Sequence, residues 1–186
     1  MPKVPGKATR LTARALGNLL RRGGKLPLER ASGNLGRDLL ALGLEPRLLG
    51  AGADYKVWRV GKYVLKQPHR RGQGRLTRRM VELFGALAKA PEFRRYRHLV
   101  PAAGDAGHGI LWQRFVSGTL GEKLEARGLT VTTGKAMERL HDAAYKALER
   151  RGLLQKVCLD VHGGNLVYGR NRRLKAWIDP FAFFKR

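Results

Sequence analysis

The chain has 186 residues, of which 38 are lysine or arginine and 14 are aspartate or glutamate, so its formal net charge is +24. This length fits one domain or one two-lobed unit, and a hydrophobic content of 43% argues against disorder. The single cysteine excludes an internal disulfide, and no apolar run approaches the ~20 residues that span a bilayer. We therefore expect a soluble chain that is held together by packing.

The charge favours anionic partners without choosing among them. A positive potential attracts phosphates, nucleic acid, an anionic membrane or an acidic protein. However, much of the excess is arginine in a chain rich in alanine, glycine and leucine, which is the composition that a GC-rich coding sequence tends to produce. Both interpretations stay open from composition alone.

The first 30 residues are basic and loosely amphipathic. Apolar side chains recur at helical spacing, while arginines occupy the other faces. We expect a basic segment that packs on its own domain, although a surface-lying helix or a nucleic-acid-binding arm would have the same pattern. The residues that share the predicted apolar face are Leu11, Ala15, Leu19 and Leu20.

A second short helix is predicted after Ser32 or Asn34, either of which can cap its N-terminus. From Arg47 the pattern changes to strand spacing, with Gly61 and Lys62 forming a tight hairpin turn. The elements predicted after this helix are strands over 48–52, 57–60 and 63–67, a helix over 76–89, a short helix opened by Pro91, strands over 100–103 and 110–116, helices over 119–127 and 133–151, the second capped by Thr132 or Thr133, and strands over 157–159, 166–168 and 176–178.

The segment with the clearest chemical pattern lies near the end of the chain. Asp160 is followed by Asn165 five residues later and by Asp179 fourteen residues after that, with apolar residues on either side. Mg²⁺ takes oxygen ligands from one or two side chains together with the phosphates of a nucleotide. Asn165 and Asp179 could supply these side chains, and Asp160 could orient or deprotonate an attacking hydroxyl.

The run Asp160-Val161-His162-Gly163-Gly164-Asn165 resembles the catalytic loop of the protein-kinase-like superfamily, and especially the D-x-H-x-x-N form of aminoglycoside phosphotransferases. In this resemblance His162 supports the loop. The alternative is a glycine-rich hairpin with an incidental Asp and Asn. The upstream motifs occur in the order that the kinase resemblance requires, which argues against that alternative.

Two of these motifs concern the nucleotide phosphates. Gly50 and Gly52 lie in a stretch that resembles the kinase glycine-rich loop, although Tyr55 stands where the family pattern has its third glycine. Tyr63-Val64-Leu65-Lys66 resembles the V-A-I-K strand. The resemblance implies that Lys66 binds the α- and β-phosphates of ATP.

The resemblance also implies a carboxylate that pairs with the lysine and a segment that meets the adenine. Glu92 is favoured as the partner of Lys66 over Glu82, because Glu82 falls nearly opposite the apolar face of its helix. The backbone around Gln113 and Phe115 would meet the adenine edge.

Only seven residues follow Asp179, so we expect a shortened lower lobe, as in the minimal bacterial kinases of the YrbL type and the HopBF1-like effector kinases. The expected fold is α+β and two-lobed, with a small antiparallel-sheet lobe over 47–116, a truncated helical lobe over 117–186 and a basic helical extension over 1–46. The resemblance to these bacterial kinases implies action in the cytoplasm of a bacterium, or in that of a host cell for an injected effector.

The expected function is ATP- and Mg²⁺-dependent phosphorylation of a protein hydroxyl by a minimal Ser/Thr kinase. A first alternative is a kinase-shaped protein of weak or no activity whose basic surface binds nucleic acid or an acidic partner. A second alternative is a small-molecule kinase of the aminoglycoside type. The complete set of Lys66, Asp160, Asn165 and Asp179 favours catalysis over the first alternative.

Overall fold

The computed structural model describes residues 11–28, 33–52, 55–69, 74–129, 135–155 and 157–183. The chain forms two compact units, which consist of Met1–Arg78 with Gly104–Phe115 and of Arg79–Ala103 with Val116–Arg186. These units differ from the predicted division, because the N-terminal residues join the strands that follow them, and residues 79–103 join the second unit. Helices and strands are mixed within the chain, so its class is α+β. No helix of the described residues is both long and apolar enough to cross a membrane.

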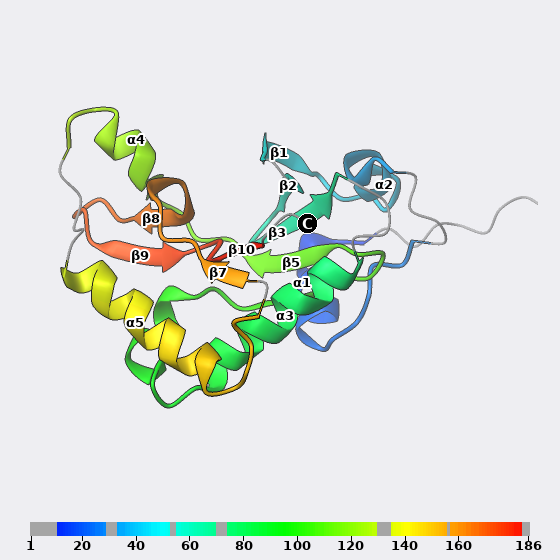
Figure 1. The fold of residues 1–186 in the computed structure, drawn as a ribbon. Helices are drawn as coiled ribbons and strands as arrows, with labels where there is room; N and C mark the ends of the chain where they lie inside the picture. The colour runs from blue at the N-terminus through cyan, green and yellow to red at the C-terminus, as the bar shows by residue number, and fades with distance from the viewer. Residues whose placement is uncertain are drawn as a thin grey trace, which may run out of the picture. The chain divides into compact units, whose positions relative to one another are not determined.

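The first unit is built on a five-stranded sheet in the order β1-β2-β3-β5-β4 (Figure 1). Neighbouring strands pair antiparallel from β1 to β2, from β2 to β3 and from β3 to β5. The predicted hairpin is confirmed: Val60 pairs with Tyr63, and Gly61 adopts φ +55°, which glycine allows without strain. The strands are β1 (Arg47–Ala51), β2 (Tyr55–Val60), β3 (Tyr63–Pro68), β4 (Ala103–Asp105) and β5 (Leu111–Arg114).

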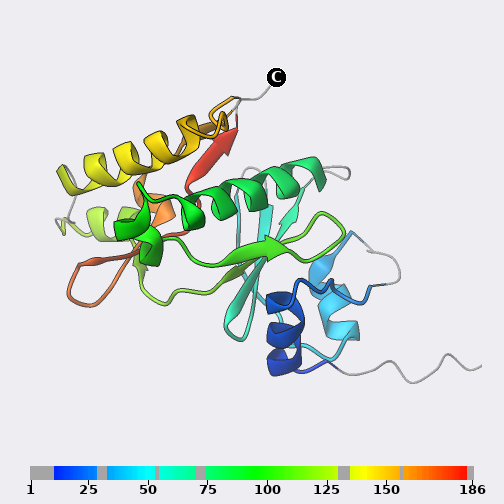
Figure 2. The same ribbon diagram turned by 90° about the horizontal axis from the view of Figure 1, so that it is seen from below.

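Two short helices, α1 (Ala13–Arg21) and α2 (Leu35–Ala41), pack with this sheet (Figure 2). Thr12 and Asn34 cap them by accepting hydrogen bonds from backbone N–H groups of the first turn. The described part of the basic N-terminal segment therefore packs on its own domain, as predicted. The buried core of this unit consists of Leu16, Leu20, Leu26, Leu35, Leu39, Leu44, Val60, Leu65, Ala106, Ile110 and Trp112.

The predicted apolar face of α1 is correct in part. Leu20 is buried and Leu11 packs against the core, as predicted, whereas Ala15 is exposed and Leu16 is buried in its place. The close approach of α1 and α2 to the side chains of the sheet requires glycine in both helices. A Cβ at Gly17 would lie 2.6 Å from the ring of Tyr63, and one at Gly36 would lie 2.4 Å from the ring of Trp58.

The second unit combines helices with two small sheets. Helix α3 (Gly74–Lys89) begins in the first unit and continues into the second. The order of the three-stranded sheet is β6-β8-β9, and the two-stranded sheet pairs β10 with β7. The remaining elements are the 3-10 helices η1 (Arg94–Leu99) and η2 (Gly163–Asn165), the helices α4 (Gly121–Glu125) and α5 (Lys135–Glu149), and the strands β6 (Thr119–Leu120), β7 (Val157–Leu159), β8 (Leu166–Tyr168), β9 (Leu174–Trp177) and β10 (Phe181–Phe183).

Some predicted elements of this unit need correction. The strand predicted over 100–103 is wrong, because β4 begins only at Ala103. The helix predicted from Thr119 begins at Gly121, since Thr119 and Leu120 pair with β8 instead. The predicted cap of α5 at Thr132 or Thr133 lies outside the described residues. The helix predicted after Pro91 is a 3-10 helix that starts at Arg94, so Glu92 lies before it.

Candidate functional site

Asp160 follows directly on β7, and the pairing of β7 with β10 determines its neighbour. Leu159 is opposite Phe181 in that pairing. One residue further on, the backbone N–H of Asp160 donates to the carbonyl oxygen of Pro180 at 2.9 Å. The first residue of the predicted catalytic loop therefore lies beside the residue that follows Asp179.

Asn165 lies at the junction of η2 and β8. Leu166 is opposite Trp177 in the pairing of β8 with β9, and the N–H of Ile178 donates to the carbonyl oxygen of Asn165 at 2.8 Å. Asp179 is thus preceded by a residue bonded to Asn165 and followed by a residue bonded to Asp160. Two backbone hydrogen bonds bring together the three residues that the spacing predicted as a set.

Trp177 supports the backbone of Asp160. Its indole Nε1 donates to the carbonyl oxygen of Asp160 at 2.7 Å, and its side chain is completely buried. The side-chain amide of Asn165 donates a longer bond of 3.4 Å to the same oxygen. Trp177 is a functional residue beyond those predicted from the sequence, and its place two residues before Asp179 is the local signal for it.

His162 faces the carboxylate of Asp160. Its Nε2 lies 3.5 Å from Oδ2 of Asp160, and its Nδ1 accepts a 3.0 Å hydrogen bond from the N–H of Gly164. Because Nδ1 accepts, a neutral ring carries its proton on Nε2, which is directed to Asp160. The side chain of His162 therefore bridges the loop to the carboxylate.

Helix α4 packs closely on the same loop. A Cβ at Gly163 would lie 2.6 Å from the backbone nitrogen of Glu122, so a larger residue would push the helix and the loop apart. Tyr168, on β8, is also part of this region. Burial raises the pKa of its hydroxyl, and the negative charge of Glu125 raises it further.

The side chains of Asn165 and Asp179 match the requirements of Mg²⁺. Both side chains contain oxygen atoms that can bind a cation. The side-chain nitrogen of Asn165 donates to the carbonyl oxygen of Asp160, so the oxygen Oδ1 of the same amide does not take part in that hydrogen bond. Among the described residues no group of three or more His, Cys, Asp or Glu side chains could hold a metal ion. A cation here would therefore complete its coordination with water or phosphate oxygens, as Mg²⁺ commonly does.

In the first unit Lys66 lies on β3, between Val57 of β2 and Leu111 of β5. It is only 4% exposed, which is unusual because a buried ammonium loses its hydration. Gly50 and Gly52 belong to the hairpin of β1 and β2, and a Cβ at either position would meet no atom of the described residues within 4 Å. The packing of the described part of the chain therefore does not require glycine at these two positions.

The predicted adenine-binding segment is β5 and the residue after it. Gln113 is buried, with 2% of its surface exposed. Phe115 donates its backbone N–H to the carbonyl oxygen of Lys62 at 2.8 Å, and the guanidinium of Arg59 lies 4.0 Å from the centre of its ring. Because its N–H already has an acceptor, an adenine would have to bind other polar groups of this segment.

The carboxylates considered as partners of Lys66 both pair with arginines. Glu92 accepts from Arg150 and lies 3.8 Å from Arg151, and Glu82 pairs with Arg79 at 2.7 Å. A backbone hydrogen bond at Glu92 lowers its pKa, and the hydrogen bond and charge of Arg150 lower it further. Glu92 belongs to the second unit and Lys66 to the first, and their pairing stays a prediction.

Comparison with protein-family profiles and with curated proteins finds no match for this chain.

Proposed function

We propose that the chain is an ATP- and Mg²⁺-dependent phosphotransferase with a two-lobed, protein-kinase-like fold, and that it phosphorylates a serine or threonine hydroxyl of another protein. One observation carries this proposal. The hydrogen bonds from Asp160 to Pro180 and from Ile178 to Asn165 enclose Asp179, so three residues with complementary roles in phosphoryl transfer form one cluster.

The second unit supplies the groups that act on the acceptor and on the metal. The acceptor oxygen attacks the γ-phosphorus of ATP, the bond from that phosphorus to the β,γ-bridging oxygen breaks, and ADP leaves. Asp160 orients the hydroxyl and accepts its proton. Asn165 and Asp179 would hold Mg²⁺, which neutralises charge on the phosphate oxygens.

The first unit supplies the nucleotide-binding groups. Lys66 lies on β3 and binds the α- and β-phosphates through its charge. Gly50 and Gly52 let the hairpin backbone approach the phosphates, because glycine has no side chain of its own and a Cβ at either position would meet no atom of the described residues within 4 Å.

The net charge of +24 supports a macromolecular acceptor over a small molecule. A strong positive field raises the encounter rate with acidic proteins, which have many charges to attract. We place the activity in the cytoplasm, where ATP is available. Whether this is the cytoplasm of a bacterium or of its host stays a prediction.

The test is incubation of the purified chain with γ-labelled ATP, Mg²⁺ and a cell lysate. Discrete labelled proteins are expected with the natural chain. Asp160→Ala is expected to lower the rate by about 10²–10⁴-fold, which is the usual contribution of a positioned proton acceptor. Asp179→Ala is expected to abolish the label. Asp142→Ala is the matched control, because Asp142 is an exposed carboxylate on α5.

Nucleotide binding is measured separately through the melting temperature. A non-hydrolysable ATP analogue with Mg²⁺ is expected to raise the melting temperature of the natural chain. Lys66→Met should reduce this rise, whereas Lys62→Met, in the exposed hairpin turn, should not. Absence of both label and thermal shift would refute the proposal.

The net charge of +24 also supports a second candidate function. In this candidate a kinase-shaped protein without phosphotransferase activity binds nucleic acid. Salt-dependent binding of RNA or DNA, together with no phosphate incorporation, would favour this candidate. Aromatic residues make up only 8% of the chain, so the stacking platforms typical of single-strand binders are sparse.

A further inference from the structure

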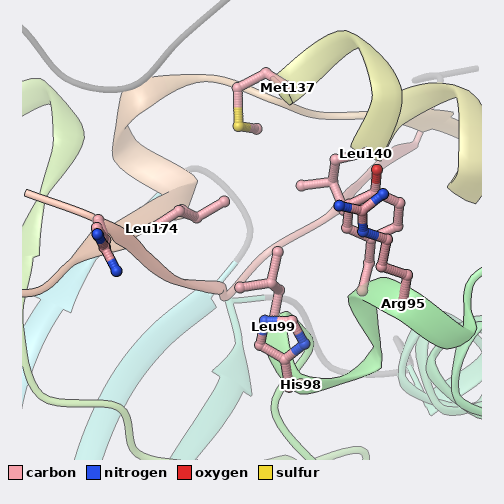
Figure 3. A pocket seen from close by; sticks show the side chains of 8 residues that line it. Arg95, His98, Leu99, Met137, Leu140 and Leu174 are labelled. Carbon is pink, nitrogen blue, oxygen red and sulfur yellow. The ribbon is translucent and has the colours of Figure 1, made fainter. Parts of the chain in front are cut away.

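The second unit contains a cavity of about 280 Å³ outside the predicted catalytic cluster (Figure 3). Its wall comes from three separate elements, namely η1, α5 and the hairpin that leads into β9. The lining residues are Arg95, Tyr96, His98, Leu99, Met137, Leu140, Arg173 and Leu174.

The floor of this pocket is apolar. Leu140 and Leu99 are 1% and 7% exposed, and Met137 is 8% exposed. Figure 3 shows Met137 and Leu140 of α5 and Leu174 of β9 directed toward one common space above Leu99. An apolar group placed there would lose its contact with water on several sides, which is favourable.

The rim of the pocket is cationic. Arg95, His98 and Arg173 are all exposed. Within the described ranges no carboxylate pairs with the guanidinium of Arg95 or Arg173, whereas Arg79 and Arg150 of the same unit both have a glutamate partner. Two guanidinium groups beside an apolar floor favour a ligand that is apolar at its centre and anionic around it.

We propose that this pocket docks an acidic segment of a partner protein, with one bulky apolar side chain of that segment on the floor and its carboxylates at Arg95 and Arg173. The volume of about 280 Å³ leaves room for a single anchoring side chain of such a segment. This inference does not depend on phosphoryl transfer.

Charge complementarity identifies the occupant as another molecule. The positive electrostatic field of a chain with net charge +24 attracts acidic partners during the encounter. The terminal segments of the chain itself that lie outside the described ranges have the wrong sign. Residues 1–10 contain three cationic side chains, and residues 184–186 contain two. Neither segment contains a carboxylate side chain.

The test uses a fluorescein-labelled peptide in which one phenylalanine stands between two pairs of acidic residues, and its binding is followed by fluorescence anisotropy. The pocket variant carries Arg95→Glu and Arg173→Glu. The matched control carries Arg94→Glu and Arg170→Glu, which lie on the same two elements, do not line the pocket and change the net charge equally. Circular dichroism establishes that both variants are folded.

We expect the pocket variant to bind at least about tenfold more weakly than the natural chain, and the control variant to lose much less. A peptide with alanine in place of phenylalanine should also bind about tenfold more weakly. Equal losses in both variants would indicate unspecific attraction and overturn the proposal. Failure of the peptide to bind would also overturn the proposal. Binding of decanoate without binding of the peptide would indicate that the pocket takes a small apolar anion instead.

Discussion

The indole Nε1 of Trp177 donates a 2.7 Å hydrogen bond to the backbone carbonyl oxygen of Asp160, and the donor lies on a completely buried side chain. The two residues are 17 positions apart in the chain. This bond ties the end of β9 to the loop that follows β7. Asp160 is therefore held from its backbone, while its carboxylate faces His162.

Replacing Trp177 by phenylalanine should lower both stability and phosphate transfer. The change removes the donor to Asp160 and leaves a partly buried carbonyl oxygen with one weaker bond, at a cost of about 0.5–1.5 kcal/mol. The free energy of unfolding, measured with urea, checks the stability. The rate of phosphate incorporation at a temperature where the variant is folded checks the position of Asp160.

Trp58→Phe is the matched control for this experiment. In the described part of the chain Nε1 of Trp58 is buried and has no hydrogen-bond acceptor. Removing an unsatisfied buried donor relieves a desolvation penalty, so only packing is lost. Trp58→Phe should therefore cost clearly less than Trp177→Phe, and equal losses would contradict the role assigned to the Trp177 hydrogen bond.

Deleting residues 1–46 should prevent the first unit from folding. Six leucines of its core lie in this segment, and each buried leucine contributes about 1.5–3 kcal/mol. Their loss is comparable with the whole stability of a typical domain, about 5–15 kcal/mol. Yield of soluble protein and circular dichroism are the measurements. Deleting only residues 1–10, which carry none of these leucines, is the control and should leave a folded protein.

Alanine at Gly36 and at Gly85 should have opposite effects on stability. At Gly36 the new Cβ would lie 2.4 Å from the ring of Trp58, so α2 would have to move from the sheet. At Gly85, inside α3, it would meet no atom of the described residues within 4 Å, and alanine is the better helix former by about 0.5–1 kcal/mol. The melting temperature should fall in Gly36→Ala and rise in Gly85→Ala, relative to the natural chain. An unchanged melting temperature of Gly36→Ala would contradict the close packing of α2 on Trp58.

Asp105 should make the first unit sensitive to acid. Burial alone would raise its pKa, but the hydrogen bonds from Lys25 and from the N–H of Gly107 outweigh burial and lower the pKa below the ordinary value of 3.8. A lowered pKa in the folded state stabilises the protein above the ordinary pKa. That contribution is lost as the pH falls through the lowered value.

The measurement is the difference in melting temperature between the natural chain and Asp105→Asn. It should be clear at about pH 6 and shrink progressively as the pH falls below the ordinary pKa and through the lowered one, because the carboxyl of Asp105 then becomes protonated. A difference that does not change with pH over this range would show that the charge of Asp105 does not contribute.

The sequence by itself determined the features that neighbouring residues encode. The Gly61-Lys62 hairpin, the long helices α3 and α5 and the cap at Asn34 follow from turn chemistry, periodicity and capping within short windows. The spacing of Asp160, Asn165 and Asp179 also indicated that these residues lie close together, which the backbone hydrogen bonds around Asp179 bear out. Such signals need no knowledge of how distant segments meet.

Only the tertiary structure decided the contacts between segments that are far apart in the chain. The pairing of β10 with β7, the bond from Trp177 to Asp160 and the ion pair of Glu92 with Arg150 each join elements that have no local pattern in common. Their formation depends on which surfaces become buried together, and burial is a property of the whole fold. For the same reason the packing of α1 on the sheet buries Leu16, where the sequence pattern predicted Ala15.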